Sequence, residues 1–295
     1  MELKHIRGNT YYFDLQSVIG VYIFNDLSCV LIDSSNSIKI VKEVLETLKK
    51  EGITIQGIIN THAHADHCIG NQLIQQETNC KIYASSMEAV LLENPIMSPM
   101  SLYSAAPFKA LKNRFLLQPE CKVTDIVEPG FIKINDVDFK IIDLKGHSIQ
   151  HIGIKTQDDV LFLGDSIIHS KIIEEYYFTY AANVKEMIDS FTTIQQENYS
   201  EVIVSHGGII SDLEKAINQN NDLLNNLFEL ILKELNTPKT REVIIANVIE
   251  NLNLPINRNQ YLLIFATISA ILTYLIDLNK IKVYTDKTHL MFIAK

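Results

Sequence analysis

The sequence predicts a mixed α/β protein in which two β-sheets pack face to face, with helices outside them and a small helical unit at the C-terminus. Strand and helix patterns occur in two similar runs before about residue 210, and each run ends in a polar cluster. Because a sheet must bury one face, two such runs favour two packed sheets over a single doubly wound sheet. After about residue 211 the patterns become helical.

The first run opens with three strand patterns that are rich in β-branched and aromatic residues, "TYYFDL", "VIGVYIF" and "SCVLID". A helix follows over "SIKIVKEVLETLKKEG", where Gly52 is placed to end it. The strand "IQGIIN" comes next and delivers a histidine cluster at its C-terminal end. A helix from near His67 to Gln76, the strand "KIYAS" and a short helix from Ser86 to Leu92 complete this run.

The segment Asn94–Leu117 interrupts the alternation. It contains three prolines and two methionines and shows no clean period, so it predicts an inserted loop that could cover a substrate site as a lid. The second run then follows, with strand patterns "CKVTDIV", "GFIKI", "VDFKIIDL", "HIGIKT" and "VLFLGD", a helix around Val184–Gln196 and the strand "EVIVSHG".

The C-terminal part predicts a separate unit. A long amphipathic helix, "DLEKAINQNNDLLNNLFELILKEL", ends near Asn236, and Thr237–Pro238 breaks the pattern. Two more helices and a hairpin around Thr285–Lys287 follow, which is the order of a winged-helix unit. We therefore expect a catalytic domain over residues 1–236 and a winged-helix-like domain over residues 237–295.

Composition limits the classes of partner. The 295-residue chain has 47% hydrophobic and 21% charged residues and a net charge of −9, which disfavours a nucleic-acid binder. The four cysteines form no C-x-x-C pair, and the N-terminus lacks a signal-peptide pattern, so we expect a cytoplasmic, disulfide-free protein.

The apolar stretch Tyr261–Ile276 is shorter than the roughly 18–20 residues of a membrane span and predicts a buried or interface helix. Such a helix needs a partner surface, so the C-terminal unit is expected to form a homodimer or to cover the active-site mouth.

The stretch "THAHADH" carries the main chemical signal. His62 and His64 alternate at a strand end and project to the same side, so both imidazoles can reach one metal ion. Asp66 and His67 begin the next helix and can face a second ion.

Three further clusters follow predicted strands, where open sheets build their sites. They place His147 in "KGHS", Asp165 in "LGDS" and His206 in "SHGG". Together with the first cluster they predict one ion held by His62, His64 and His147, and another held by Asp66, His67 and His206. Asp165 is left as a bridge. A donor set of imidazoles and carboxylates suits two divalent ions, with Zn favoured and Fe or Mn as alternatives. Cys68 lies beside these ligands and is expected to be a packed neutral thiol.

These motifs resemble the metallo-β-lactamase-fold hydrolase superfamily, whose signature is T-H-x-H-x-D-H followed by G-H-[ST], G-D and a late H-G. The resemblance covers roughly residues 5–235, and within the superfamily the motif set resembles the glyoxalase II-like branch. It implies an αββα four-layer sandwich, a dinuclear site and the ligand assignments given above. The chain departs from the family pattern after the first motif, at Cys68–Asn71, and at the turn Asp33–Ser35. Neither departure removes a ligand.

The predicted activity follows from two adjacent cations. They lower the pKa of a shared water, and the hydroxide that bridges them attacks a small ester, thioester or lactone. Asp66 and Asp165 fix the ions and orient this nucleophile, and are therefore the predicted catalytic residues. Two alternatives stay open, an RNA-processing metallo-nuclease and a single-iron enzyme similar to persulfide dioxygenases. His169, Tyr177 and Tyr180 follow the Asp165 motif and are candidates for the substrate pocket.

Overall fold

The computed structural model describes residues 1–173 and 178–295 and contains two large β-sheets. The first sheet has seven strands, which lie in chain order from one edge to the other. They are β1 (Lys4–Arg7), β2 (Thr10–Phe13), β3 (Ile19–Ile23), β4 (Ser28–Ile32), β5 (Thr54–Ile59), β6 (Lys81–Ala84) and β7 (Asp125–Ile126). Strands β1 to β4 pair antiparallel, whereas β4 to β7 pair parallel, each after a crossover.

The second sheet has six strands in the order β13-β12-β11-β10-β9-β8. They are β8 (Gly130–Ile134), β9 (Val137–Asp143), β10 (Ile152–Lys155), β11 (Val160–Phe162), β12 (Glu201–Val204) and β13 (Gly208–Ile209). Side chains of both sheets, among them Tyr22, Ile59, Phe139 and Ile154, form one buried cluster. The two sheets therefore pack face to face, as predicted.

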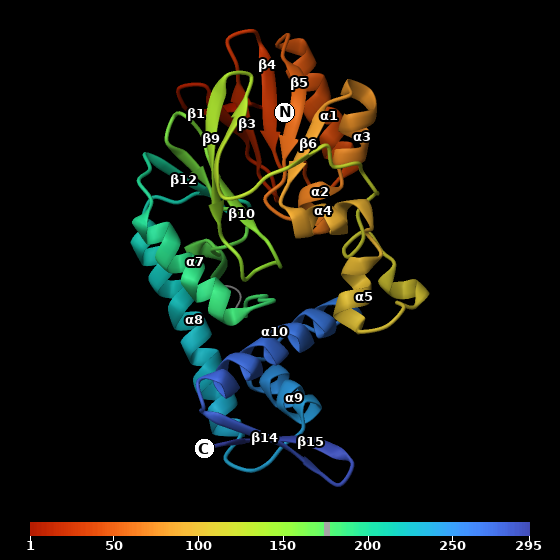
Figure 1. Ribbon diagram of the computed structural model, residues 1–295, viewed down its shortest axis with the longest axis vertical. Coiled ribbons are helices and arrows are strands. Elements are labelled where there is room, and N and C mark those ends of the chain that lie inside the picture. Colours follow the sequence, from red (N-terminus) through yellow and green to blue (C-terminus); the bar gives the residue numbers. More distant parts are fainter. Residues whose placement is uncertain (174–177) are drawn as a thin grey trace.

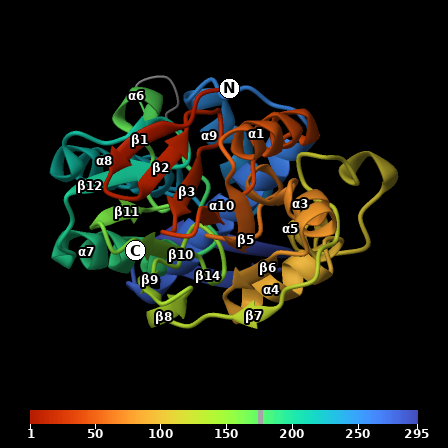
Figure 2. The same cartoon turned by 90° about the horizontal axis from the view of Figure 1, so that it is seen from above.

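Helices cover the outer faces of this sandwich (Figures 1 and 2). Those that follow strands of the first sheet are α1 (Ile38–Lys50), α2 (Ala65–Cys68), α3 (Asn71–Thr78) and α4 (Ser86–Glu93), and those that follow strands of the second are α6 (Ser170–Ile173), α7 (Val184–Gln196) and α8 (Leu213–Glu234). Val41 and Val44 of α1 pack with Leu31 of β4, and Phe191 of α7 packs with Val202 of β12. The predicted four-layer αββα arrangement is confirmed.

Two predictions about local structure were wrong. The insert expected to be an irregular loop contains a helix, α5 (Met97–Tyr103), and a short 3₁₀ turn at Lys109–Leu111. Leu111 and Leu116 of the insert pack with Leu262, so contacts with a distant helix give this segment its order. The pattern "CKVTDIV" forms only the two-residue edge strand β7. Whether the insert acts as a lid stays a prediction.

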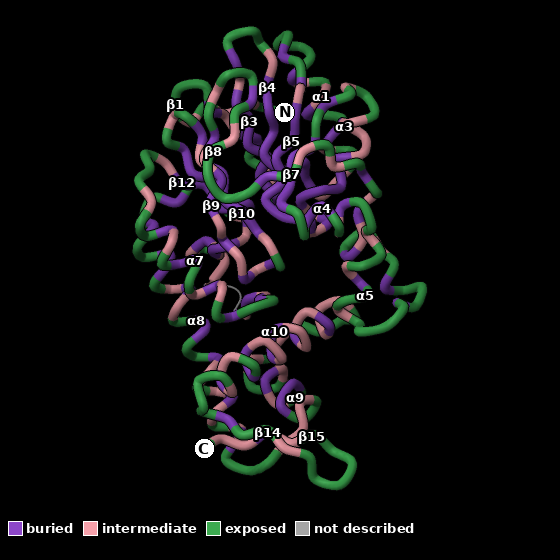
Figure 3. Tube along the Cα trace, in the orientation of Figure 1, coloured by how far each residue is buried: buried purple, intermediate pink, exposed green. Residues whose placement is uncertain are grey.

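The C-terminal unit contains α9 (Arg241–Asn251), α10 (Arg258–Asp277) and a hairpin of β14 (Ile281–Asp286) and β15 (His289–Ala294). The order of two helices and a hairpin agrees with the predicted one. Its core is continuous with that of the sandwich, because Ile268 and Leu272 share one buried cluster with Phe191 and Leu224. Figure 3 shows buried stretches of the chain in both parts. The domain boundary at residue 236 stays a prediction.

Among the described residues, α10 is the helix that is long and apolar enough to cross a membrane by length and composition, and 39% of the tested stretch is buried in the fold. It lies across the C-terminal unit and contacts α5, α7, α9 and β14 (Figure 1). The homodimer was predicted because this apolar helix needs a surface to pack against, and elements of the same chain supply such a surface. The homodimer stays a prediction, but the apolar helix no longer argues for it.

Candidate metal centre

The four polar clusters meet where the two sheets adjoin. His62, His64, Asp66 and His67 follow β5 and run into α2, and His147 follows β9. Asp165 and His206 follow β11 and β12. The structure brings these seven predicted donors together as two groups, in each of which one ligand atom from every residue lies within 4.8 Å of the others.

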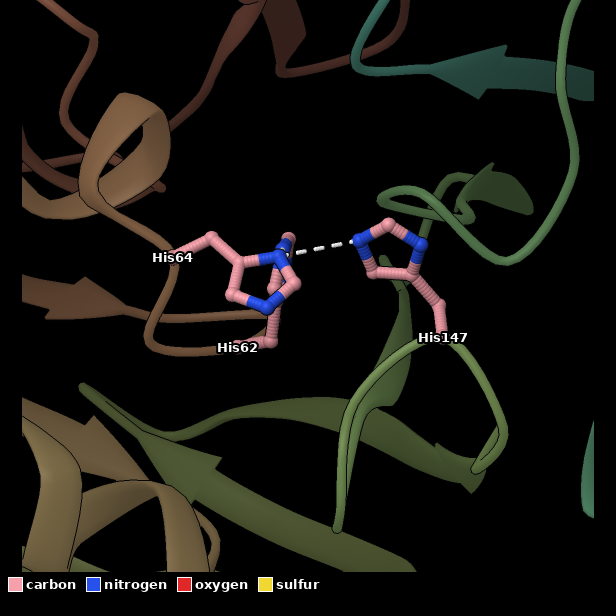
Figure 4. A group of neighbouring side chains, drawn as sticks. All are labelled: His62, His64 and His147. Carbon is pink, nitrogen blue, oxygen red and sulfur yellow. Dashed lines mark hydrogen bonds between the residues drawn. The ribbon is translucent and has the colours of Figure 1, made fainter. Parts of the chain in front are cut away.

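The first group consists of three imidazoles. Nδ1 of His64 lies 3.0 Å from Nε2 of His62 and 3.0 Å from Nε2 of His147. Figure 4 shows the three rings converging, with His147 approaching from the other sheet. Donor atoms about 3.3 Å apart are what a tetrahedral ion with bonds of roughly 2.0–2.1 Å requires. The observed spacing therefore fits one shared ion.

The second group contains Asp66, His67, Asp165 and His206. Oδ2 of Asp66 lies 3.1 Å from Nε2 of His206 and 3.6 Å from Nε2 of His67. Asp165 stands between the groups, because its Oδ2 lies 3.5 Å from Nε2 of His147, 3.4 Å from that of His67 and 3.5 Å from that of His206. This is the position that a bridging carboxylate needs.

Two buried atoms in this centre lack a hydrogen-bond partner within the described part of the chain, Nε2 of His67 and Oδ1 of Asp165. Leaving such atoms unpaired in a folded protein costs about 1–3 kcal/mol each. Both are good ligands for a divalent ion, which would satisfy them. The donor set therefore fits divalent metal ions by its chemistry as well as by its spacing.

The surroundings keep the first group uncharged. Burial lowers the pKa of His147 to about 3 and holds that of His62 well below its ordinary value. A neutral imidazole offers a free lone pair, which is the form that binds metal.

In the second group the carboxylates favour protonated, positively charged histidines. The negative charge of Asp165 raises the pKa of His206 to about 10. Burial opposes protonation of His67, but Asp165 and Asp66 outweigh it and raise its pKa well above the usual value. Without ions, protons on His67 and His206 offset the two carboxylates, and bound cations would displace those protons.

Asp33 orients ligands of both groups from a fully buried position. Its Oδ2 accepts hydrogen bonds from Nδ1 of His67 at 3.0 Å and from the hydroxyl of Thr61 at 2.8 Å. The oxygen of Thr61 lies 2.9 Å from Nδ1 of His62. These contacts leave Nε2 of both imidazoles facing the centre. Sequence reasoning treated Asp33 only as a departure from the family turn, although its place directly after an apolar strand was a usable signal.

Glycines allow the loops to approach closely. Gly146 has a φ of +122°, and a Cβ there would lie 2.3 Å from the backbone nitrogen of Met187. Gly164 has a φ of +57°, and a Cβ there would lie 2.4 Å from Nε2 of His151. That nitrogen accepts a hydrogen bond from the backbone of Asp165 at 3.1 Å. Glycine is therefore needed before His147 and before Asp165, because a side chain at either position would clash with the neighbouring atoms.

The remaining predicted residues have different places. The Tyr180 ring lies 5.6 Å from that of His64 and 5.4 Å from that of His147, centroid to centroid. His169 packs against Gly207, next to His206, and both its ring nitrogens face backbone atoms. It supports that turn, and its role in a pocket stays a prediction. Tyr177 lies outside the described residues. Cys68 is buried, and its Sγ donates to the backbone oxygen of His62 at 3.1 Å.

Comparisons with known proteins agree with this centre. A hydroxyacylglutathione hydrolase from Prochlorococcus marinus (strain MIT 9312) is 25% identical over 161 residues, which are 52% of this chain and 54% of that protein. One from Rhodopseudomonas palustris (strain BisB18) is 26% identical over 125 residues, 42% of this chain and 38% of that protein. The chain thus spans about half or less of these relatives.

The crystal structure of a beta-lactamase domain protein from Burkholderia ambifaria superposes with a TM-score of 0.76 over 100% of this chain and 94% of that one, at 13% identity. This likeness shows the shared fold. The sequence model of the metallo-beta-lactamase superfamily matches residues 13–206, which include all seven donors. The predicted resemblance and enzyme class are confirmed, and the chain belongs to the metallo-beta-lactamase superfamily.

Proposed function

We propose that this protein is a metal-dependent hydrolase of a small thioester, with esters and lactones as related substrates. The observation that carries the proposal is the pair of donor groups joined by Asp165, which offers adjacent places for two divalent ions. The name of the relatives, hydroxyacylglutathione hydrolase, supports a thioester as the first substrate to test.

Divalent ions at such a centre lower the pKa of water and polarise an acyl oxygen. The protein's own groups then direct the reaction. Asp66 and Asp165 are placed to accept hydrogen bonds from the attacking water and to orient it. The water gives up one proton as its oxygen adds to the acyl carbon, the carbon–sulfur bond breaks, and the leaving thiolate takes up that proton, so the products are a carboxylic acid and a thiol.

Tyr180, whose ring lies 5.6 Å from that of His64, is the proposed hydrogen-bond donor to the substrate. Burial raises the pKa of its hydroxyl to about 12, so the group keeps its proton near neutral pH. The residues directly after Tyr180 are fixed: the backbone nitrogens of Ala182 and Asn183 donate to the oxygen of Gly146 at 2.8 and 3.0 Å, and that of Ala181 donates to the Thr267 hydroxyl on α10 at 3.1 Å. The C-terminal unit thereby supports a residue beside the metal centre.

Replacing Tyr180 by phenylalanine is expected to lower kcat by about 100-fold, the usual effect of losing one donor to a developing oxyanion. Metal content should stay the same, because the hydroxyl belongs to neither donor group. Steady-state thioester hydrolysis and elemental analysis measure the two quantities. Tyr199→Phe is the control, since that ring is 41% exposed and lies outside the insert. Equal kcat for Tyr180→Phe and wild type would remove Tyr180 from the mechanism.

The proposed function is tested on tag-free protein by elemental analysis and by a panel of a thioester, a lactone and a phosphodiester. We expect about two zinc ions per chain and thiol release that a chelator abolishes and added zinc restores. Cleavage of the phosphodiester or RNA alone would replace the proposal with the nuclease alternative. One iron per chain with oxidation of a persulfide would replace it with the dioxygenase alternative.

A further inference from the structure

Glu88 on α4 is a fully buried carboxylate that the chemistry above does not use. Within residues 1–173 and 178–295, no lysine, arginine or histidine nitrogen lies within 4.0 Å of its oxygens. Burying a charge without a partner of opposite sign costs several kcal/mol unless hydrogen bonds compensate for it. The position of this carboxylate therefore needs an explanation.

Its hydrogen bonds join the loops that carry the first donor group. Oε2 accepts from the backbone nitrogen of Ala63, which lies between His62 and His64, at 2.9 Å. Oε1 accepts from the Ser148 hydroxyl at 2.6 Å and from the backbone nitrogen of Gln150 at 2.9 Å, just after His147. One carboxylate thus binds a loop of the first sheet with one oxygen and a loop of the second sheet with the other.

A second set of contacts fixes α4 to the same loop. The Gln150 side-chain oxygen accepts from the backbone nitrogen of Met87 at 2.8 Å and from the Ser86 hydroxyl at 2.9 Å. The Ser85 hydroxyl donates to the backbone oxygen of Gln150 at 2.6 Å. Gln150 therefore satisfies free donors at the start of α4, so the helix that carries Glu88 cannot shift away from the His147 loop without losing these bonds.

Charge gives Glu88 a further role. The three imidazoles of the first group bring no negative charge to a divalent ion, and Asp165 is shared with the second group. A fixed anion directly behind the ligand loops, in a medium of low dielectric, favours a cation in front of them.

We propose that Glu88 is a positioning residue: it holds His62 and His64 at the right distance from His147 for one ion, and its charge strengthens cation binding there. The inference rests on the metal centre of the proposed function and is independent of the substrate. It explains why a carboxylate is buried at a place where no cationic side chain of the described residues meets it.

The test is the affinity for zinc in a Glu88→Gln variant, measured by competition with a chromophoric chelator and resolved into two binding steps. Glutamine has the same shape, but its amide group must face one of the N–H donors, so one tie between the loops is lost. Changes of groups that orient metal ligands cost about 10–100-fold in affinity, and we expect a loss of this size in one of the two steps. Glu93→Gln is the matched control, because Glu93 lies on the same helix and accepts from the backbone nitrogen of Val123 at 3.1 Å, away from the ligand loops. It should bind both ions as the wild type does.

Circular dichroism of the metal-free variants checks that they fold. If Glu88→Gln does not fold, the variants Ser148→Ala and Gln150→Ala are measured instead. Ser148→Ala removes one hydrogen bond to Glu88, Gln150→Ala removes the side-chain bonds to the start of α4, and both keep the Glu88 carboxylate. We expect weaker binding in the same single step for both. A folded Glu88→Gln that binds both ions with wild-type affinity would overturn the inference, as would wild-type affinity in both smaller variants. Wild-type protein that binds two zinc ions but cleaves no thioester would instead reject the proposed function and leave Glu88 as inferred.

Discussion

Replacing Asp165 by alanine is expected to lower hydrolysis by at least about 10³-fold, a loss of ~4 kcal/mol of transition-state stabilisation. The physical reason is the central place of its carboxylate, since Oδ2 lies 3.4–3.5 Å from Nε2 of His147, His67 and His206. Without it the second group keeps one carboxylate, and two adjacent cations lose the anion between them. Elemental analysis should show the metal content falling from about two ions per chain.

Two further variants sharpen this prediction. Asp165→Asn keeps the shape and removes the charge, so it separates the loss of a bridging anion from the loss of packing at a side chain that is 13% exposed. Asp189→Ala is the control, because that carboxylate pairs with Lys185 on the exposed face of α7. Full metal content and activity in Asp165→Ala would show that the two groups do not act as one centre.

The ligands could be predicted from the sequence because each lies in a short motif at the end of a strand. Each of His62, His147, Asp165 and His206 directly follows an apolar strand pattern, and the ends of such strands are where sites are built, so the four could be assigned to one centre although they come from two sheets. The local pattern also marked the end of α1 at Gly52, whose φ is +72°.

The residues that hold the ligands could not be found in this way. Asp33 reaches His67 across 34 positions, and Glu88 reaches Ser148 across 60. Asp33 follows an apolar strand, as the ligands do, but Glu88 has no such signal, and the partners of both residues depend on which loops the fold brings to them. The helix α5 was missed for a similar reason. Its Pro99 lies in the first turn, where proline is tolerated, and its order comes from packing of the insert on α10.

The metal-stripped protein is expected to be most stable near pH 6.5–7 and to lose stability steeply as the pH falls toward 4. Burial lowers the pKa of His147 to about 3 and those of His62 and His151 well below the ordinary value. The unfolded chain binds a proton at each of these residues below about pH 6.5, whereas the folded chain does not. Stability therefore falls with falling pH, because protons bind to the unfolded chain and not to these buried imidazoles.

The opposite sign holds above neutrality. Asp165 raises the pKa of His206 to about 10, so its contribution is fully present below about pH 6.5 and is lost as the pH rises toward 10. Urea unfolding of chelator-treated protein from pH 4 to 10 measures both slopes. His151→Asn should reduce the acid slope, because one of the imidazoles whose pKa burial lowers is gone. His289→Gln should leave it unchanged, since His289 is exposed on the hairpin.

The same protons compete with metal ions, and this links stability to the proposed function. Bound ions hold the imidazoles in their unprotonated form, so acid must displace the ions before it can charge the ligands. Zinc-loaded protein should therefore unfold at a lower pH than metal-stripped protein, and its zinc should be released over the pH range in which it unfolds. An acid transition that is the same with and without zinc would mean that the buried imidazoles do not bind the metal. A stability curve that is flat between pH 7 and 5 would mean that they are not kept neutral by the fold.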